Sequence, residues 1–539
     1  MALFAKLALA LCAIFGPPFS LPLADASRTP IQPDRESAQA NAHHIFNAIH
    51  SAGRQWGSSL KHNGFSFFPV VMSKGSLLYH GTPSNSPPPG PEWLAFEVEH
   101  AEAFVLFKTP RGNQQSQEPR MRPGQKPLGH SSSREASKPH DKNMRGYLHT
   151  YRAERDLNLL YVDGMSAAKT HKGTLDSQDL VLRENNTSPV WDPFMDELTR
   201  ASDICDLIKE WGYDGFMRME IGFEVIYCDF SVGVDLMTAK RTVPHHDQRE
   251  DELMNPYQWV RAVAERYDGL GGDRVRIDFS SMVSGYFFPI NISNTDPERP
   301  DLHRLAAAGL DELKDIKSRV RGVFTEPRRF TVNWQAVVDM IVTRFSGRLR
   351  AMASSKLSSS KFISELAVAS LSYFDAPPLP GDITMMEDKD KNRTAEAVDA
   401  CIKHYLLPTY LDQDSWSLED GLIHAAIETV MSGICTKLFA MRSIILEVSS
   451  ATPPFGPHIP RDGDKEQLDK AVEASRRIVH TLREELAWTT WRMPQVCPID
   501  ELLLTVMWPM GDPEDYWNPG CRPIDEISFS RRGYWRPDI

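Results

Sequence analysis

Hydrophobic spacing divides the chain into an N-terminal part of mixed elements and a C-terminal part dominated by helices. Short β-rich runs alternate with helical stretches, at residues 76–79, 147–151, 157–162 and 224–230. The clearest helix in this part spans residues 194–211, where apolar side chains recur every three or four positions and Gly212 follows as a stop. The pattern predicts an α+β domain over residues 65–240.

Beyond residue 245 strand signals become sparse and the helical period prevails. Four helical stretches stand out, at residues 334–352, 395–407, 418–448 and 464–486. The last of them begins with Asp464 and Gln467 at the spacing of a capping box. We therefore expect a multidomain chain, with a mainly α-helical domain over residues 245–539. A polar and partly helical segment, residues 27–64, precedes the α+β domain.

The first 26 residues have the pattern of a secretory signal peptide. A short n-region with Lys6 precedes an apolar run at residues 7–15, and Ala24-Asp25-Ala26 forms an A-x-A cleavage site. The apolar run covers only about half of the ~20 residues that a membrane-spanning helix needs. We therefore expect residues 1–26 to be removed and the protein to be secreted into the extracellular space.

One later stretch needs a separate assignment because it is long and apolar. Residues 418–448 contain Glu428, Lys437 and Arg442, which favours a buried amphipathic helix over a membrane span. We therefore expect no membrane-spanning segment in the mature chain.

Cysteine usage agrees with an oxidising compartment. Six cysteines follow the predicted signal, at positions 205, 228, 401, 435, 497 and 521. Six cysteines allow about 15 pairings, so spacing alone does not fix the connectivity. Proximity along the chain favours three local disulfides, between Cys205 and Cys228, Cys401 and Cys435, and Cys497 and Cys521.

Asparagine sequons add a second expectation for an exported chain. Asn185, Asn186, Asn291 and Asn392 each begin an N-x-S/T sequence. Such asparagines accept glycans only at the surface, so we expect these positions to be exposed and some of them to be glycosylated.

The net charge of the chain limits the classes of partner that the protein is expected to bind. The chain has 60 Lys and Arg against 72 Asp and Glu, a formal net charge of −12, which argues against nucleic-acid binding. One local exception is the insertion at residues 108–142, which is basic and poor in large apolar side chains. We expect this insertion to be disordered, either as a solvated loop or as a contact for anionic polymers. The sequence does not predict an oligomeric state.

Three ordered motifs carry a resemblance to a known family. The first is LLYHGT at residues 77–82, an apolar strand that ends in His-Gly-Thr. The second is EWLAF at 92–96, followed by AEAF at 101–104. The third is GYDG at 212–215, followed by a strand headed by Glu224. Together the motifs resemble the ADP-ribosyltransferase superfamily, particularly its divergent members with an H-G-T first motif. The resemblance covers about a third of the chain.

The resemblance implies roles for the first two motifs. His80 would donate a hydrogen bond to a ribose hydroxyl of NAD, which would be the substrate. Gly81 would let the backbone approach the nicotinamide amide, and Thr82 would close the turn. Trp93 or Phe96 would stack on the nicotinamide ring, and the sequence does not decide between them.

The resemblance also implies a catalytic carboxylate. Glu224 would bond the 2′-hydroxyl of the nicotinamide ribose and stabilise the oxocarbenium-like charge that develops as nicotinamide leaves. ADP-ribose would pass to water or to an unknown acceptor, and the residues would line an open cleft. Arginine-specific transferases place two acidic or amide residues one residue apart, whereas Glu220 lies four before Glu224. This departure weakens arginine as the acceptor.

Two alternatives stay open at this stage. A non-catalytic secreted glycoprotein on the same scaffold would use the basic insertion or the helical domain for contacts. An unrelated secreted hydrolase would use Ser166 and Lys169, which match S-x-x-K. We expect no metal, because His43-His44 and His245-His246-Asp247 lack the partner spacing of a ligand set. LLYVDGMSAAK at 159–169 is also similar to uncharacterised secreted fungal proteins, and this similarity carries no activity.

Overall fold

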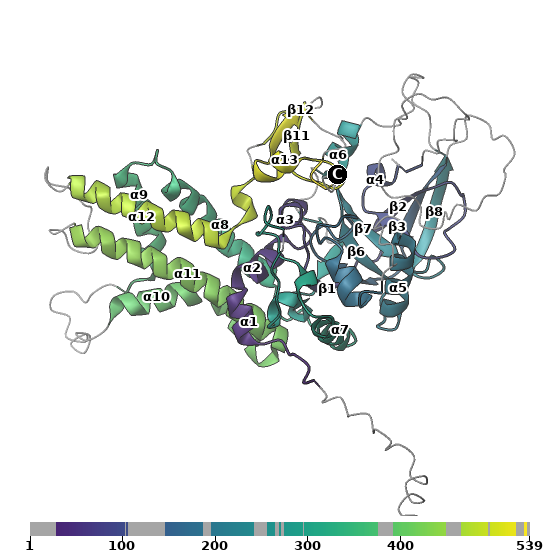
Figure 1. Ribbon diagram of the computed structural model, residues 1–539, viewed down its shortest axis with the longest axis horizontal. Helices are drawn as coiled ribbons and strands as arrows, with labels where there is room; N and C mark the ends of the chain where they lie inside the picture. Colours follow the sequence, from purple (N-terminus) through teal and green to yellow (C-terminus); the bar gives the residue numbers. More distant parts are fainter. Residues whose placement is uncertain are drawn as a thin grey trace, which may run out of the picture.

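The computed structural model describes thirteen stretches of the chain. They are residues 28–102, 104–105, 146–186, 196–241, 256–264, 269–270, 274–294, 296–375, 392–448, 465–493, 496–523, 526 and 533–535. The predicted signal peptide, the basic insertion and His245-His246-Asp247 lie outside the described residues. A large sheet forms one end of the molecule and long helices form the other (Figure 1).

The sheet has ten strands and is mixed. Its order is β10-β1-β5-β6-β7-β3-β2-β4-β8, and β9 also pairs with β1. Among the described strands β5 and β6 pair in parallel, and the other pairs are antiparallel. The strands are β1 (Ser66–Met72), β2 (Leu77–Thr82), β3 (Glu92–Ala95), β4 (Tyr147–Ala153), β5 (Leu157–Val162), β6 (Gly215–Met219), β7 (Phe223–Tyr227), β8 (Val234–Arg241), β9 (Val275–Ile277) and β10 (Val283–Ser284).

A helical crossover joins the two parallel strands, as parallel pairing requires. It contains the π-helix η1 (Ser177–Leu182) and α5 (Glu197–Lys209). The predicted helix at 194–211 corresponds to α5, and Gly212 beyond it has a φ of +84°, which fits the left-handed position after a helix. Cys205 of α5 is bonded to Cys228 at the end of β7, so the crossover is fixed to the sheet.

The segment before the sheet forms three short helices. They are α1 (Arg35–Ala40), α2 (Ala42–Ser51) and α3 (Gln55–Leu60), and they lie between the sheet and the long helices (Figure 1). Ile45, Phe46 and Ile49 of α2 are buried in the core that continues into both parts. The prediction of a partly helical segment is confirmed, and these helices join the two parts of the fold.

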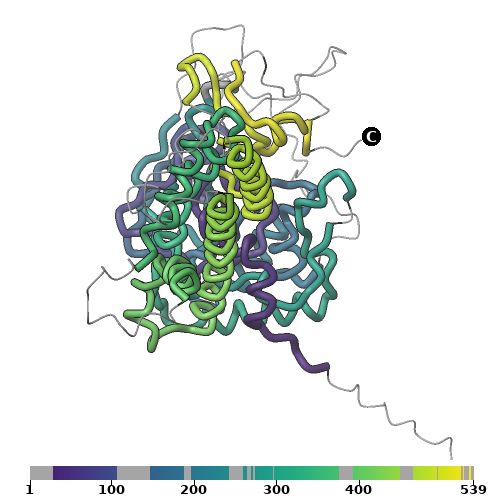
Figure 2. Tube along the Cα trace, turned by 90° about the vertical axis from the view of Figure 1, so that its left-hand side faces the viewer, coloured from purple at the N-terminus to yellow at the C-terminus, as the bar shows by residue number. Residues whose placement is uncertain are grey.

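The C-terminal part is mostly helical, as predicted. Its long helices are α7 (Leu310–Phe324), α8 (Trp334–Ala353), α9 (Ser359–Ser370), α10 (Arg393–Lys403), α11 (Leu418–Val448) and α12 (Lys465–Leu486). Figure 2 shows α11 and α12 side by side. Shorter helical turns are η2 (Phe279–Ser281), η3 (Gly285–Phe287), η4 (Leu305–Ala307), η5 (Leu371–Tyr373), η7 (Leu407–Ser415) and η8 (Thr489–Trp491).

α11 is the one described helix that could cross a membrane by length and composition. Sixteen of its 31 residues are buried, and it contacts α1, α2, α9, α10 and α12. These contacts support its assignment as a core helix.

The last part of the chain returns to the sheet. α6 (Pro256–Ala264) contacts α4 (Val98–Glu102). A hairpin of β11 (Glu501–Leu504) and β12 (Gly520–Pro523) follows, with α13 (Pro513–Trp517) between its strands. Side chains of α6 and β11 share a small hydrophobic cluster of their own. The sheet continues past the predicted domain boundary near residue 240, since β9 and β10 follow that residue in the chain. The boundary therefore stays a prediction.

All three predicted disulfides are present. Cys401–Cys435 joins α10 to α11, and Cys497–Cys521 ties the start of the C-terminal hairpin to β12. The four sequon asparagines are exposed, as predicted, and their glycosylation stays a prediction. Three disulfides are compatible with an extracellular protein.

Candidate active site

Three neighbouring strands carry the candidate residues. β3 lies between β2 and β7, and its residue Ala95 pairs with Tyr79 on one side and with Glu224 on the other. The strand order therefore brings the first, second and third motifs of the sequence to one region of the sheet.

The candidate side chains form a row inside the protein. The ring centroid of Trp93 lies 5.3 Å from that of His80 and 5.7 Å from that of His100, a residue of α4. His100 Nε2 lies 3.4 Å from Glu220 Oε1. One ligating atom each of His100, Glu220 and Glu224 lies within 4.8 Å of the others. The row thus runs from His80 through Trp93 and His100 to the two carboxyl groups.

Glu224 is held by an arginine from the neighbouring strand. Arg218 pairs with Glu224 across β6 and β7, and its Nε donates to Glu224 Oε1 at 2.7 Å. Its guanidinium also donates to Glu197 and, at 3.2 Å, to Gln178 Oε1. Burial raises the pKa of Glu224, and the positive charge of Arg218 opposes that shift. The arginine therefore favours the ionised form of this buried carboxyl group.

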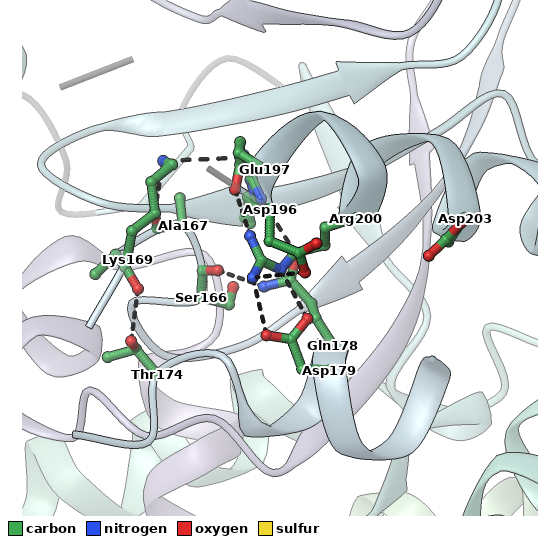
Figure 3. Close-up of polar contacts among 12 residues, drawn as sticks. Ser166, Ala167, Lys169, Thr174, Gln178, Asp179, Asp196, Glu197, Arg200 and Asp203 are labelled. Atoms are coloured by element: carbon green, nitrogen blue, oxygen red, sulfur yellow. Dashed lines mark hydrogen bonds and ion pairs between the residues drawn. The ribbon is translucent and has the colours of Figure 1, made fainter. Parts of the chain in front are cut away.

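A larger network of buried charges supports this arginine. Glu197 lies between Lys169 and Arg200 (Figure 3). Arg200 forms a bidentate pair with Asp179, at 2.8 and 2.9 Å, and donates to Glu197 at 2.7 Å. Burial raises the pKa of Glu197, but the charges of Arg218, Lys169 and Arg200 outweigh it and hold that pKa well below its usual range. The network fixes the position of Arg218 and hence of Glu224.

Several polar atoms of the row are buried without a hydrogen bond. Among the described residues these are both ring nitrogens of His80, Trp93 Nε1, His100 Nδ1, Glu220 Oε2 and Glu224 Oε2. Native proteins pair most buried polar atoms, because an unpaired one costs about 1–3 kcal/mol. Glu220 Oε2 lies 3.7 Å from Lys169 Nζ, and the other five atoms make this row the candidate site.

Burial sets the charge of His80. It lowers the pKa of His80 to about 3, with a smaller contribution from His149, whose ring centroid lies 6.2 Å away. His80 is therefore neutral at physiological pH and has one N–H to donate and one nitrogen to accept.

The other predicted residues have different surroundings. A Cβ on Gly81 would lie 2.2 Å from Ala101 O, so glycine is required here by the close approach of α4. Thr82 Oγ1 accepts a 3.4 Å hydrogen bond from Ser84 N, in a turn-closing position. Phe96 lies apart from the row, with the guanidinium of Arg274 5.6 Å from its ring centroid. Trp93 is thus the aromatic residue of the row.

The expectation of an open cleft is wrong for the described conformation. His80 and Glu224 have no exposed surface, and Trp93 is 1% exposed. A Cβ on Gly222, in the turn between β6 and β7, would lie 2.5 Å from Val263 of α6. Met507 and Met510 pack with α6 in the same hydrophobic cluster. α6 and the chain around residues 502–510 therefore cover this end of the row, and we call them the α6 cover.

His100, Glu220 and Glu224 are the described residues whose geometry approaches a metal site. The positive charges at both carboxyl groups oppose a cation there. Arg218 bonds to Glu224, and Lys169 Nζ lies 3.7 Å from Glu220 Oε2. Electrostatic repulsion makes this donor set a poor fit for a divalent ion.

The S-x-x-K alternative has unsuitable geometry. Ser166 is fully buried and its Oγ donates to Val162 O at 2.7 Å. Lys169 Nζ donates to Ala167 O at 2.9 Å and faces Glu197 and Glu220. The amine is thus engaged with acceptors other than the Ser166 hydroxyl.

Sequence reasoning missed His100, Arg218 and Glu197. His100 directly precedes the second part of the second motif, and Arg218 lies six residues before Glu224 on the partner strand of a hairpin. The recognition of that hairpin would have placed Arg218 opposite Glu224. Glu197 reaches the site through the crossover helix, and no local pattern reveals that approach.

Comparison with known proteins gives relatives in yeast. The YPL277C N-terminal domain matches residues 34–145 and 125–250, a region that includes the whole row. Uncharacterized protein YOR389W of Saccharomyces cerevisiae is 28% identical over 543 residues, 87% of this chain and 82% of the relative. Uncharacterized protein YPL277C of the same yeast is 30% identical over 383 residues, 58% of this chain and 75% of the relative. No solved structure matches the chain.

Proposed function

The chain belongs to the family that carries the YPL277C N-terminal domain, and from the row of residues inside that domain we propose that it binds NAD and cleaves the nicotinamide–ribose bond. The product ADP-ribose passes to water or to an acceptor of unknown identity. The proposal retains the resemblance of the three motifs to the ADP-ribosyltransferase superfamily. Secretion of the protein is proposed separately, from the signal-peptide pattern of residues 1–26.

The single observation that carries the proposal is the set of unpaired polar atoms along the row. They come from β2, β3, β7 and the elements beside them, in the order that the three motifs imply. A dinucleotide offers hydroxyl and amide groups that would satisfy them. The cost of leaving these atoms unpaired is then offset when the substrate binds.

Each residue has a role that its surroundings permit. Neutral His80 donates to a ribose hydroxyl, and Trp93 stacks on the nicotinamide ring. Glu224, whose ionised form Arg218 favours, stabilises positive charge on the ribose as the bond between C1′ and the nicotinamide nitrogen breaks. The bonding electrons leave with nicotinamide. Water then adds to C1′ and loses a proton.

The α6 cover must move for this reaction. Substrate of this size cannot reach a row with almost no exposed surface, so the described conformation is a closed state. Movement of α6 away from Gly222 would open the end of the row that holds Glu220 and Glu224.

A second candidate is a non-catalytic secreted glycoprotein on the same scaffold. The complete burial of Glu224 in an ion pair favours it, because an Arg–Glu pair inside a protein also occurs as a purely structural feature. This candidate predicts no NAD binding.

Calorimetric titration of the full chain with NAD separates the two candidates. We expect wild type and the exposed control Glu447→Gln to bind, and His80→Phe to bind at least tenfold more weakly because it lacks ring nitrogens. Thermal unfolding of each variant confirms that it is folded. The absence of binding by folded wild type at millimolar NAD would favour the non-catalytic candidate.

A further inference from the structure

A second group of buried polar residues lies where α3 meets the C-terminal segment. At its centre is the ring of Tyr516 from α13. The guanidinium carbon of Arg299 lies 3.7 Å from the ring centroid, and that of Arg492 lies 4.4 Å from it. The Tyr516 hydroxyl donates to Asp301 at 2.6 Å and lies 3.3 Å from Leu60 O. Segments from three distant parts of the chain therefore meet beside Lys61, which follows Leu60.

Positive charge exceeds negative charge in this group. Asp301 is its one acid among the described residues, and Arg299 already holds it through two hydrogen bonds of 2.9 and 3.0 Å. Lys61 and Arg492 have no carboxylate partner within the described parts of the chain. Asp301 also attracts Lys61, so one acid serves three cations and the group keeps an excess of positive charge.

Some of their donors are also unpaired. Arg299 Nη1 and Arg492 Nη2 are buried and have no hydrogen-bond partner among the described residues. Stacking on Tyr516 contributes a cation–π attraction but satisfies no N–H group. A guanidinium that stacks on an aromatic ring and presents free N–H groups is a common means of phosphate recognition.

Lys61 connects this group to a cavity. The cavity has a volume of about 40 Å³ and is lined by Lys61 together with residues of α2, Tyr286 and the turn after β5, which contributes the carboxyl group of Asp163. Asn47 Oδ1 and Ser51 Oγ, from two of its lining residues, are buried without a partner. The cavity therefore has room for a small ion or for water, but not for a larger organic ligand.

We propose that Lys61, Arg299 and Arg492 form a binding site for a phosphate group, either as free inorganic phosphate or as the phosphoryl group of a small ester. A phosphate dianion supplies two negative charges, which balance the two positive charges that Lys61, Arg299 and Arg492 have in excess over Asp301. Its oxygens accept from the unpaired N–H groups of both arginines and from the ammonium of Lys61.

The charge state of the surrounding groups agrees with an electropositive site. Burial lowers the pKa of Lys61; the charge of Asp301 opposes this shift, and those of Arg492 and Arg299 add to it. Burial raises the pKa of Asp301, but the hydrogen bonds from Arg299 and Tyr516 outweigh this and lower that pKa to about 2. A bound anion relieves the repulsion among the cations, so binding stabilises the folded protein.

The test is calorimetric titration of the full chain with inorganic phosphate at constant ionic strength. We expect saturable binding to wild type and binding at least tenfold weaker to Lys61→Met and Arg492→Met. Lys356→Met and Arg477→Met, at exposed positions, are the matched controls and should bind like wild type. Thermal unfolding verifies the fold of each variant. Glu224→Gln should also bind phosphate like wild type, so failure here is distinguishable from failure of the NAD proposal.

A parallel titration with glycerol 3-phosphate identifies the source of the group. Binding of the free ion alone, or of the ester alone, supports the site and shows which form it accepts. Absence of saturable binding of both to wild type would overturn the proposal. Equal losses in the exposed control variants would also overturn it, because the effect would then be a general one of net charge.

Discussion

Arg218 and Glu224 face each other across strands β6 and β7, with Nε 2.7 Å from Oε1 and with both side chains almost fully buried. This pair links the buried charge network to the row of candidate residues. On one side it belongs to the buried charge network around Glu197, and on the other it ends the row of unpaired polar atoms. The carboxylate proposed for catalysis is therefore also part of what holds the sheet together.

Removal of this arginine should destabilise the protein strongly. Arg218→Met leaves Glu224 and Glu197 without a shared partner in a buried place, and breaking such a pair costs about 3–5 kcal/mol. Denaturant unfolding of wild type and variant measures the loss. Arg152→Met is the control, because its pair with Asp235 is exposed and should contribute less than about 1 kcal/mol. Equal, small losses in both variants would show that the network is not structural.

Asp163 should make stability depend on pH. Burial raises its pKa from 3.8 to about 7, although its Oδ1 accepts from Ser66 N at 2.8 Å. Because the folded-state pKa is the higher one, the stabilising contribution is complete below about pH 4 and is lost as the pH rises through 7. The shift in pKa corresponds to a loss of roughly 4 kcal/mol in the free energy of unfolding.

Asp163→Asn should therefore gain unfolding free energy relative to wild type between pH 4 and pH 8. Denaturant unfolding at several pH values measures this difference, and Asp412→Asn, at an exposed position, controls for the loss of one carboxylate. A difference between Asp163→Asn and wild type that stays constant across this range would contradict the shift.

Gly81→Ala should lower stability because its Cβ would collide with Ala101 O. Backbone atoms cannot move as easily as a side chain, so we expect a loss of about 1–3 kcal/mol, the usual range for overpacking. Gly90→Ala is the matched control, since nothing lies within 4 Å of its added Cβ. The comparison of thermal midpoints checks this, and an unchanged midpoint for Gly81→Ala would contradict the close approach of α4.

Val263→Ala should loosen the α6 cover. Val263 packs on Gly222 and belongs to the hydrophobic cluster that covers the row. Amide hydrogen exchange at residues 220–222 should become faster, because local opening needs less free energy. Val232→Ala, at a position 54% exposed, should leave this exchange unchanged. Unaltered exchange in Val263→Ala would mean that α6 does not control access.

Long patterned elements could be predicted from the sequence, whereas short ones could not. Residues 157–162 and 418–448 were predicted with the bounds of β5 and α11, because each is a continuous stretch rich in apolar residues. β9 and β10 have only three and two residues, and pairing with β1 defines them. The three disulfides were predictable because each joins cysteines close together in the chain.

The candidate site was also predictable from the sequence only in part. The motifs led to His80, Trp93 and Glu224, which the strand order brings into one region. His100 was missed because its approach depends on how α4 packs, and Arg218 was missed because the hairpin of β6 and β7 was not recognised in the sequence. The closure of the site was missed because its cover comes from α6 and residues 502–510, far along the chain.

Nicotinamide release from NAD by the full chain tests the central claim most directly. Wild type and Glu447→Gln should release nicotinamide, and Val263→Ala should release it faster because its cover opens more readily. Glu224→Gln keeps the size of the side chain but removes its charge, so its rate should fall about 100-fold. Equal rates for wild type and Glu224→Gln, or no release even by Val263→Ala, would contradict the account.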